Sequence, residues 1–260
     1  MNKSVRLASG LVAIVLAVGV LAACASAPVT GRNQLILVSE PEAQQMGLQA
    51  YQQILEKSTI SDRQDYNRRV NTIGRRIAAV SGKPELDWEF TVIEDDTPNA
   101  FALPGGKVGV HTGLFKVAEN DDQLATVMAH EVAHAIARHG SERMSQQMVV
   151  KGGLQGLGAA TGSAGAVQLA AAAAQLGIIL PYSRDQEAEA DQIGLIYMAR
   201  AGYDPRAAVD LWRNFDAMGG DRPAEFVSTH PSPGSRIERL QELMPEALEI
   251  YKQSTSSTEQ

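Results

Sequence analysis

The stretch His130-Glu131-Val132-Ala133-His134 decides the fold of this chain, because it places two histidines one helical turn apart. Side chains four residues apart lie on the same face of an α-helix, so both imidazoles can bind one metal ion. Glu131 is turned by about 100° around the helix from His130, where its carboxylate reaches a water molecule beside the metal without being a ligand. The spacing therefore predicts a helix that carries a hydrolytic zinc site.

The flanking residues predict where this helix begins and ends. Asn120, followed by Gln123, is typical of a capping box at a helix N-terminus. Apolar residues then recur at helical spacing, and Gly140 favours a stop. We therefore expect one helix between Asn120 and Gly140 to carry both histidines.

A catalytic zinc ion takes three protein ligands, so a third must come from elsewhere in the chain. Ala137 and Gly140 occupy the positions where the metzincin pattern requires Gly and His, which excludes that pattern. His139 lies five residues after His134 and projects from a different helix face. We expect His139 to be a cation near a helix C-terminus or an ordinary surface histidine.

A second predicted helix offers the better candidate for the third ligand. Ser183 and Gln186 form another capping box, which places Glu187 in the first turns of this helix. Glu187 and Asp191 share one face, whereas Glu189 is about 200° from Glu187 and cannot reach the same metal. We assign Glu187 as the third ligand and Asp191 as the acceptor for the outer N–H of a ligating histidine. Glu189 is expected to be a helix-surface or salt-bridge residue.

A small β-sheet is predicted immediately before the helix of the two histidines. Residues 88–93 and 107–111 alternate as strands do, and Pro104 with two glycines indicates a hairpin or a sheet edge between them. We expect Asn99-Ala100-Phe101-Ala102 to lie on an edge strand that binds extended peptide by main-chain pairing. The alternative is a core hairpin with no substrate role. His111, on the presumed edge strand, is expected to be structural or substrate-lining.

The motifs together resemble one known family. His130-Glu131-xx-His134, followed by Ser183-Arg184-xx-Glu187-x-Glu189-Ala190-Asp191, is similar to the HtpX and CAAX-prenyl-protease family of gluzincin metallopeptidases. Asn99–Gly106 resembles the strand that precedes the site in that family, and His230-Pro231 with Arg236 resembles its C-terminal signature. The likeness runs from about residue 34 to 245. It implies an α+β, mainly helical, zincin-like metallopeptidase domain with a small edge sheet beside the histidine helix and one Zn²⁺ per subunit.

The resemblance also implies a role for His230, because related sites place a His or Tyr near the metal. In one interpretation His230 is a catalytic residue that donates to the oxyanion formed during the reaction. In another, His230 ligates zinc in a resting state and holds the enzyme inactive. A third is a structural histidine before a proline turn.

The N-terminal residues indicate export and a lipid anchor. Two basic residues precede an uncharged apolar run over residues 7–23, which is typical of a secretory signal. Leu21-Ala22-Ala23-Cys24 resembles the bacterial lipobox, in which the cysteine becomes the acylated first residue of the mature chain. Because no aspartate follows Cys24, the resemblance implies the periplasmic side of the outer membrane of a Gram-negative bacterium. Cys24 is the only cysteine, so a disulfide within one chain is excluded.

These patterns divide the chain into four parts. We expect a lipoprotein signal peptide over residues 1–23, a lipidated tether over 24–33, a zinc metallopeptidase domain over 34–252 and a disordered tail over 253–260. The formal net charge is −7 and becomes −9 without the two basic residues of the signal. An acidic mature chain argues against nucleic acid as a partner.

One segment of the predicted domain has no charged residue. It spans residues 152–183 and is rich in glycine and alanine. We expect either a helical hairpin packed on the catalytic helix or a mobile lid over the cleft. A transmembrane span is the third alternative.

The combined expectation is a lipid-anchored zinc endopeptidase that hydrolyses misfolded or misassembled envelope proteins. One alternative is a chaperone-like assembly factor for outer-membrane proteins with latent proteolysis. Another is a zinc amidase that acts on the cell wall. Glu131 argues against a purely binding role, because holding zinc does not require that carboxylate. The edge strand favours an extended polypeptide over the cell wall.

Overall fold

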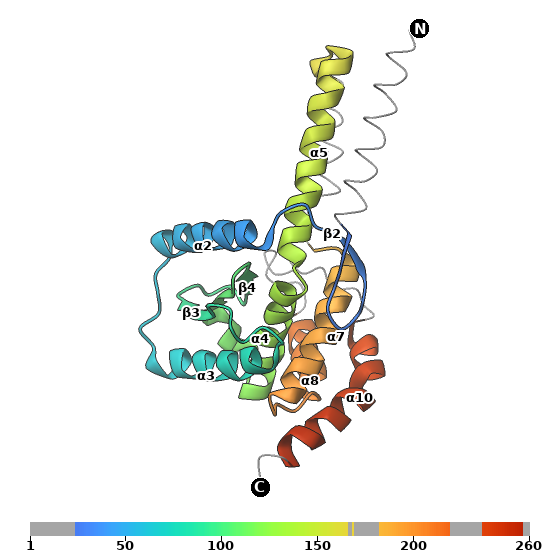
Figure 1. Cartoon of the computed structure of the whole chain (residues 1–260). Coiled ribbons are helices and arrows are strands. Elements are labelled where there is room, and N and C mark those ends of the chain that lie inside the picture. The colour runs from blue at the N-terminus through green and yellow to red at the C-terminus, as the bar shows by residue number, and fades with distance from the viewer. Residues whose placement is uncertain (1–23, 166–167, 169–181, 219–235, 257–260) are drawn as a thin grey trace.

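The computed structural model describes residues 24–165, 168, 182–218 and 236–256. The predicted signal peptide and His230 lie outside the described residues. The described chain is mainly helical with two small sheets (Figure 1), as the α+β fold class predicts. Its elements are β1 (Cys24–Ser26), β2 (Asn33–Leu35), α2 (Glu40–Lys57), α3 (Gln64–Val80), β3 (Glu89–Ile93), β4 (Ala100–Leu103), β5 (Lys107–His111), the 3₁₀ helix η1 (Thr112–Lys116), α4 (Asp121–Ile136), α5 (His139–Thr161), α7 (Arg184–Arg200), α8 (Ala207–Ala217) and α10 (Arg236–Ser256).

The larger sheet has the strand order β3-β5-β4. β5 pairs in parallel with β3 and antiparallel with β4, and Phe101 faces Gly109 across the β4–β5 ladder. Gly105 and Gly106 make the hairpin turn at φ values of 88° and 83°, which favour glycine. β4 is therefore an edge strand, as predicted. His111 lies on the central strand β5, which corrects its expected place on the edge, because the earlier strand β3 pairs with the far side of β5.

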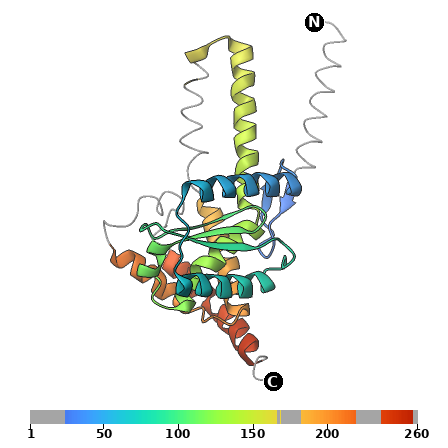
Figure 2. The ribbon, with the colours of Figure 1, turned by 90° about the vertical axis from the view of Figure 1, so that its left-hand side faces the viewer.

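Helices cover both faces of this sheet (Figure 2). On one face lies α2, where Tyr51 makes a hydrogen bond of 2.5 Å with Thr91 of β3. On the other face lie α3 and α4, and Phe90 packs there against Gly74 of α3. The hydrophobic core between the sheet and α4 contains large, fully buried side chains, among them Leu124 and Met128 of α4. The sheet thus supports the helix that carries the two histidines.

Helix α4 begins as predicted and ends earlier than predicted. The side chain of Asn120 accepts a hydrogen bond of 2.9 Å from the backbone N–H of Gln123. The helix stops at Ile136 rather than at Gly140, and Arg138 has a φ of 58°. A residue in this left-handed conformation ends a helix and redirects the chain. The next helix, α5, therefore starts at His139 along a new axis.

Helix α7 packs directly on α4. A Cβ atom at Gly194 would lie 3.0 Å from the backbone nitrogen of His130, so glycine permits the close approach of the two helices. Helix α10 packs in turn on α7, and Ser254 donates a hydrogen bond of 2.8 Å to the carbonyl oxygen of Ala199. Helix α10 runs to Ser256, beyond residue 253, where a disordered tail was expected to start.

The N-terminal hairpin comprises residues 24–35. β1 and β2 pair antiparallel, with Cys24 opposite Leu35, so the segment expected to be a tether is hydrogen-bonded from its first described residue. Helix α5 extends away from the rest of the molecule (Figures 1 and 2). Of the uncharged segment, residues 152–161 continue α5, and much of the remainder lies outside the described residues. No helix among the described residues is both long and apolar enough to span a membrane.

Candidate metal centre

Three side chains from α4 and α7 converge on one point. The Nε2 atoms of His130 and His134 are 3.0 Å apart, and the Glu187 carboxylate oxygens lie 3.5 Å and 3.3 Å from them. Ligand atoms of a tetrahedral zinc site lie about 3.3 Å apart when each is about 2.0–2.1 Å from the ion. All three residues are buried. Two imidazoles and one carboxylate at this spacing fit a zinc ion and would supply three of its four tetrahedral ligands.

Glu131 lies beside this cluster on the first turn after His130. Its side chain is buried, with 2% of the residue exposed. Burial and, after it, the charge of Glu131 raise the pKa of Tyr182 to about 12. Glu131 follows His130 directly on α4 and is not one of the three side chains whose ligand atoms converge.

Side chains of α7 and α10 contact His130 on the Nδ1 side of its ring. Its Nδ1 atom lies 3.0 Å from a carboxylate oxygen of Asp191, on α7. Arg236, at the start of α10, donates to the same oxygen at 2.5 Å and to Glu187 at 3.2 Å. The guanidinium carbon of Arg236 lies 3.7 Å from the ring centroid of Trp212. This arrangement turns the Nε2 atom of His130 toward the point of convergence.

The same contacts give the two histidines opposite pKa shifts. Burial and the Arg236 charge lower the pKa of His130, but the carboxylates of Asp191 and Glu187 outweigh them and raise it to about 9. Burial lowers the pKa of His134 well below its ordinary value, and Glu187 only partly opposes this. In the absence of metal, His130 is therefore the protonated histidine of the pair at neutral pH and His134 the neutral one.

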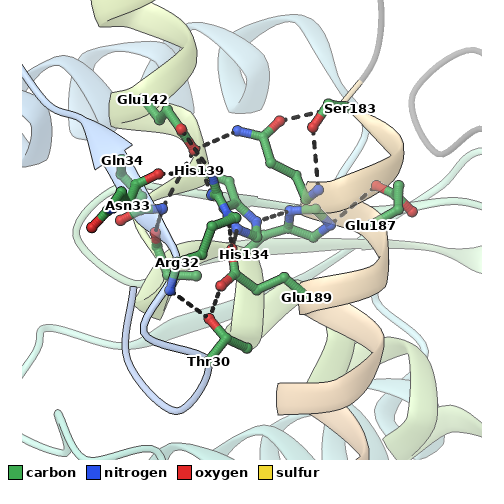
Figure 3. Close-up of polar contacts among 12 residues, drawn as sticks. Thr30, Arg32, Asn33, Gln34, His134, His139, Glu142, Ser183, Glu187 and Glu189 are labelled. Carbon is green, nitrogen blue, oxygen red and sulfur yellow. Dashed lines mark hydrogen bonds and ion pairs between the residues drawn. The ribbon is translucent and has the colours of Figure 1, made fainter. Parts of the chain in front are cut away.

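His134 contacts His139, which in turn contacts Glu189 (Figure 3). The Nδ1 atoms of His134 and His139 are 2.8 Å apart, and Nε2 of His139 lies 2.9 Å from Glu189. The ring of Tyr182 stacks on His134 with centroids 3.9 Å apart. His139 is fully buried and Glu189 is 4% exposed, so neither is the surface residue that continuous helical phase predicts. Arg138 redirects the chain and turns His139 back toward His134.

His139 is also not the cation expected at a helix C-terminus. Burial lowers its pKa below the ordinary value, although Glu189 opposes this shift. Burial raises the pKa of Glu189, but hydrogen bonds from His139, Thr30 and Arg32 outweigh it and bring the value to about 2. The pair thus consists of a neutral imidazole and an ionised carboxylate, and the salt bridge expected of Glu189 is made with Arg32 at 2.7 Å.

The predicted substrate strand lies at the rim of a cleft. Asn99 and Ala100 are buried at the start of β4, and Phe101 covers Gly109 of the neighbouring strand. The cleft has a volume of about 260 Å³. It is lined by the end of β4, including Ala102, and by parts of α2 and α5, and Tyr182 is in its wall. Tyr182, in the wall of this cleft, also stacks on His134.

Sequence patterns do not reveal the positions of Arg236, His139 and Tyr182. Arg236 follows the His230-Pro231 pair, and that resemblance is its one sequence signal. Tyr182 directly precedes the capping residue Ser183, so it begins the turn that leads to Glu187. His139 has no signal, because helical phase counted from His134 points it elsewhere.

This chain is similar to known metallopeptidases. A family model described as peptidase family M48 matches residues 64–244. The chain is 40% identical over 227 residues to mitochondrial metalloendopeptidase OMA1 of Schizosaccharomyces pombe, covering 85% of this chain and 66% of that protein. It is 33% identical over 183 residues to the beta-barrel assembly-enhancing protease of Escherichia coli, covering 65% and 37% respectively. The chain thus spans just under two thirds of the first relative and well under half of the second.

Proposed function

Because this chain belongs to peptidase family M48, we propose that it is a zinc-dependent metalloendopeptidase with His130, His134 and Glu187 as the metal ligands. The observation that carries the proposal is the convergence of these three buried side chains at the spacing of a zinc site. Asp191 is the proposed acceptor for the outer N–H of His130, at 3.0 Å.

The chain's own residues supply the proton transfers. A bound zinc ion contributes Lewis acidity, which lowers the pKa of water from about 16 to about 7 and polarises a carbonyl group. Glu131 takes the proton from the attacking water as the peptide carbonyl is attacked, and passes it to the departing amine. The burial of Glu131 excludes bulk solvent from these transfers. We also propose His230 as a donor to the oxyanion, on the basis of the family resemblance alone.

We propose that an extended polypeptide pairs with the free edge of β4. Among the described residues, β4 pairs with β5 on one side only. The backbone of Asn99, Ala100, Phe101 and Ala102 would then bind the substrate main chain, with its side chains in the cleft beside Tyr182. Main-chain pairing accepts many sequences, which suits an endopeptidase that acts on unfolded segments.

Within the family, we propose that this chain is one of the soluble lipoproteins of the HtpX and CAAX-protease type. This assignment is supported by the lipobox Leu21-Ala22-Ala23-Cys24, and we propose acylation of Cys24 and attachment to the periplasmic side of the outer membrane. A relative of this chain is named a beta-barrel assembly-enhancing protease, which favours envelope proteins as substrates. Other relatives are mitochondrial, so the proposed location rests on the N-terminal residues rather than on the family.

The activity is tested with zinc-loaded wild type and Glu131→Gln on an unfolded protein such as casein. We expect the variant to retain its zinc and to lose about 10²–10⁴-fold in cleavage rate, because the general base is gone. A wild type that leaves casein intact with equimolar zinc contradicts the proposal. A variant that loses cleavage but keeps its cellular role favours the chaperone-like alternative.

The location is tested by Cys24→Ser in the producing bacterium. Wild type should incorporate labelled palmitate and fractionate with the outer membrane, and the variant should do neither. An unlabelled wild type in the soluble fraction would refute the anchor and leave the peptidase proposal untouched.

A further inference from the structure

Hydrogen bonds connect the proposed ligand His134 to the N-terminal hairpin (Figure 3). They run from His134 to His139, from His139 to Glu189, and from Glu189 to Arg32, at distances of 2.8, 2.9 and 2.7 Å. We call His139, Glu189 and Arg32 the relay. Its members come from α5, α7 and the loop between β1 and β2, which are far apart in the sequence.

The relay allows one arrangement of protons when zinc is bound. Nε2 of His134 faces His130 and Glu187, so this atom must supply its lone pair to the metal. The proton of His134 is then on Nδ1 and is donated to Nδ1 of His139. His139 must carry its own proton on Nε2 and donates it to Glu189. Each ring N–H along the relay then has an acceptor, and these hydrogen bonds fix the orientations of the His134 and His139 rings.

Arg32 ends the relay and also holds a second carboxylate. Its Nε atom donates to Glu189, whereas Nη1 and Nη2 donate to Glu142 at 2.9 Å and 2.7 Å. The hydroxyl group of Thr30 donates to Glu189 as well. Both carboxylates are buried, so each needs a charged partner to remain ionised in the protein interior.

Docking of the hairpin does not by itself require the contact with Glu189. Gln34 donates to the carbonyl oxygen of Ala137 at 2.6 Å, at the break between α4 and α5. Arg32 binds Glu142 in bidentate form, a geometry that is already strong and specific. The Nε atom of Arg32 instead donates to Glu189, the carboxylate that accepts from His139. The Arg32–Glu189 contact therefore connects the hairpin, through His139, to the proposed ligand His134.

We propose that Arg32 is a positioning residue for the zinc site. It holds Glu189, Glu189 holds His139, and His139 holds the ring of His134 in the orientation that binds metal. The hairpin that begins at Cys24 is therefore part of the metal site and not only a connection to the membrane. The inference rests on the proposed function, because it concerns the same three ligands.

The test measures zinc affinity and ligand geometry in the full chain. The variants are Arg32→Ala, Glu189→Gln and His139→Phe, with Arg32→Lys as the conservative variant. Competition with a chromophoric chelator should show about 10- to 100-fold weaker zinc binding for His139→Phe and Glu189→Gln, and about tenfold for Arg32→Ala. The visible spectrum of the cobalt-substituted protein should shift in all three. Arg32→Lys should restore part of the affinity, because it keeps one charged donor toward Glu189.

Two variants serve as controls. Arg69→Ala removes an arginine from a surface pair with Asp121 and should match wild type in every readout. Glu142→Gln weakens the other contact of Arg32, and should lower the thermal midpoint while leaving the zinc affinity and the cobalt spectrum unchanged.

The inference is overturned if Arg32→Ala behaves like Glu142→Gln, with a lower thermal midpoint but the zinc affinity and cobalt spectrum of wild type. If Arg32→Ala does not fold, the nearly isosteric Glu189→Gln decides in the same way. A wild type that binds no zinc at all overturns both this inference and the proposed function. Tight zinc binding by wild type and Arg32→Ala alike overturns only the inference.

Discussion

The two histidines of the metal site are supported in different ways. Behind His130, a single carboxylate, Asp191, accepts from the ring and is itself bound by Arg236. Behind His134, a second imidazole stands between the ring and the carboxylate of Glu189, which Arg32 binds. A carboxylate therefore contacts Nδ1 of His130 directly, whereas for His134 the carboxylate is reached through the ring of His139.

The difference shows how the two ends of the chain share one site. The partners of His130 come from α7 and from Arg236 at the start of α10, toward the C-terminus. Those of His134 come from α5, from α7 and from the N-terminal hairpin. Among the described elements, α7 alone supplies partners to both histidines, and it also carries Glu187, so we expect changes on α7 to have the largest effects.

Replacing Glu187, the ligand that contacts both histidines, should weaken zinc binding more than any change on one side of the site. Glu187→Gln removes the charged ligand that lies within 3.5 Å of both histidines. We expect zinc affinity to fall by more than about 100-fold, beyond the loss caused by removing an outer partner. Isothermal titration with zinc measures this. Near wild-type affinity would mean that another residue supplies the third ligand.

Asp191→Asn and His139→Phe compare the two sides directly. Each should weaken zinc binding by about 10- to 100-fold. The larger loss is expected for Asp191→Asn, because that variant also leaves the buried Arg236 without its closest carboxylate. Chelator competition at fixed pH gives both values. A larger loss for His139→Phe would show that the indirect support is the stronger one.

A smaller effect is expected where α7 packs against the backbone of α4 at His130. The methyl group of Gly194→Ala would meet the backbone of α4 near 3.0 Å. Crowding of about 1–3 kcal/mol, offset by about 1 kcal/mol of helix preference, predicts a free energy of unfolding lower by about 1 kcal/mol. Urea unfolding measures this. Gly152→Ala on α5 is the control, since nothing lies within 4 Å of its added methyl group, and it should not be destabilised.

The smallest expected effect is a pH-dependent contribution to stability from Glu142, the carboxylate that Arg32 of the N-terminal hairpin binds. Burial raises the pKa of Glu142, but hydrogen bonds from Arg32 and Gln186 outweigh it and lower the value below the ordinary 4.5. A carboxyl group with a lowered pKa stabilises the fold above pH 4.5, and this contribution is lost as the pH falls through the folded-state pKa. Thermal midpoints of wild type and Glu142→Gln, both with chelator, should differ at neutral pH and converge as the pH falls below 4.5 through the folded-state pKa. Parallel curves would exclude this contribution.

The parts of the fold and the site that rely on local chemistry could be predicted from the sequence. The capping residues Asn120 and Ser183 mark the starts of α4 and α7, because a cap needs only its own helix turn. The spacing within each helix brings His130, His134 and Glu187 to one point once the helices pack. The turn at Pro104 likewise marks the hairpin that leaves β4 at the sheet edge.

Features that depend on tertiary contacts could not be predicted in this way. Arg138 adopts a positive φ although it is neither glycine nor asparagine, and Gln34 of the hairpin binds the carbonyl group just before it. That break moves His139 from an expected surface position to full burial. The role of Arg32 depends on a pairing across 157 sequence positions, for which helical and strand periodicities provide no signal.

If Cys24 is acylated as proposed, its place in β1 would set how far the enzyme can reach from the membrane. A flexible leash would let an anchored domain sample a volume that grows with linker length. Here Cys24 is already paired with Leu35 in a hairpin fixed to the catalytic body. With an acyl chain on this residue, the active site would stay at a set height above the leaflet, defined by the dimensions of the domain itself. Polypeptides would then have to approach the membrane surface to be cut.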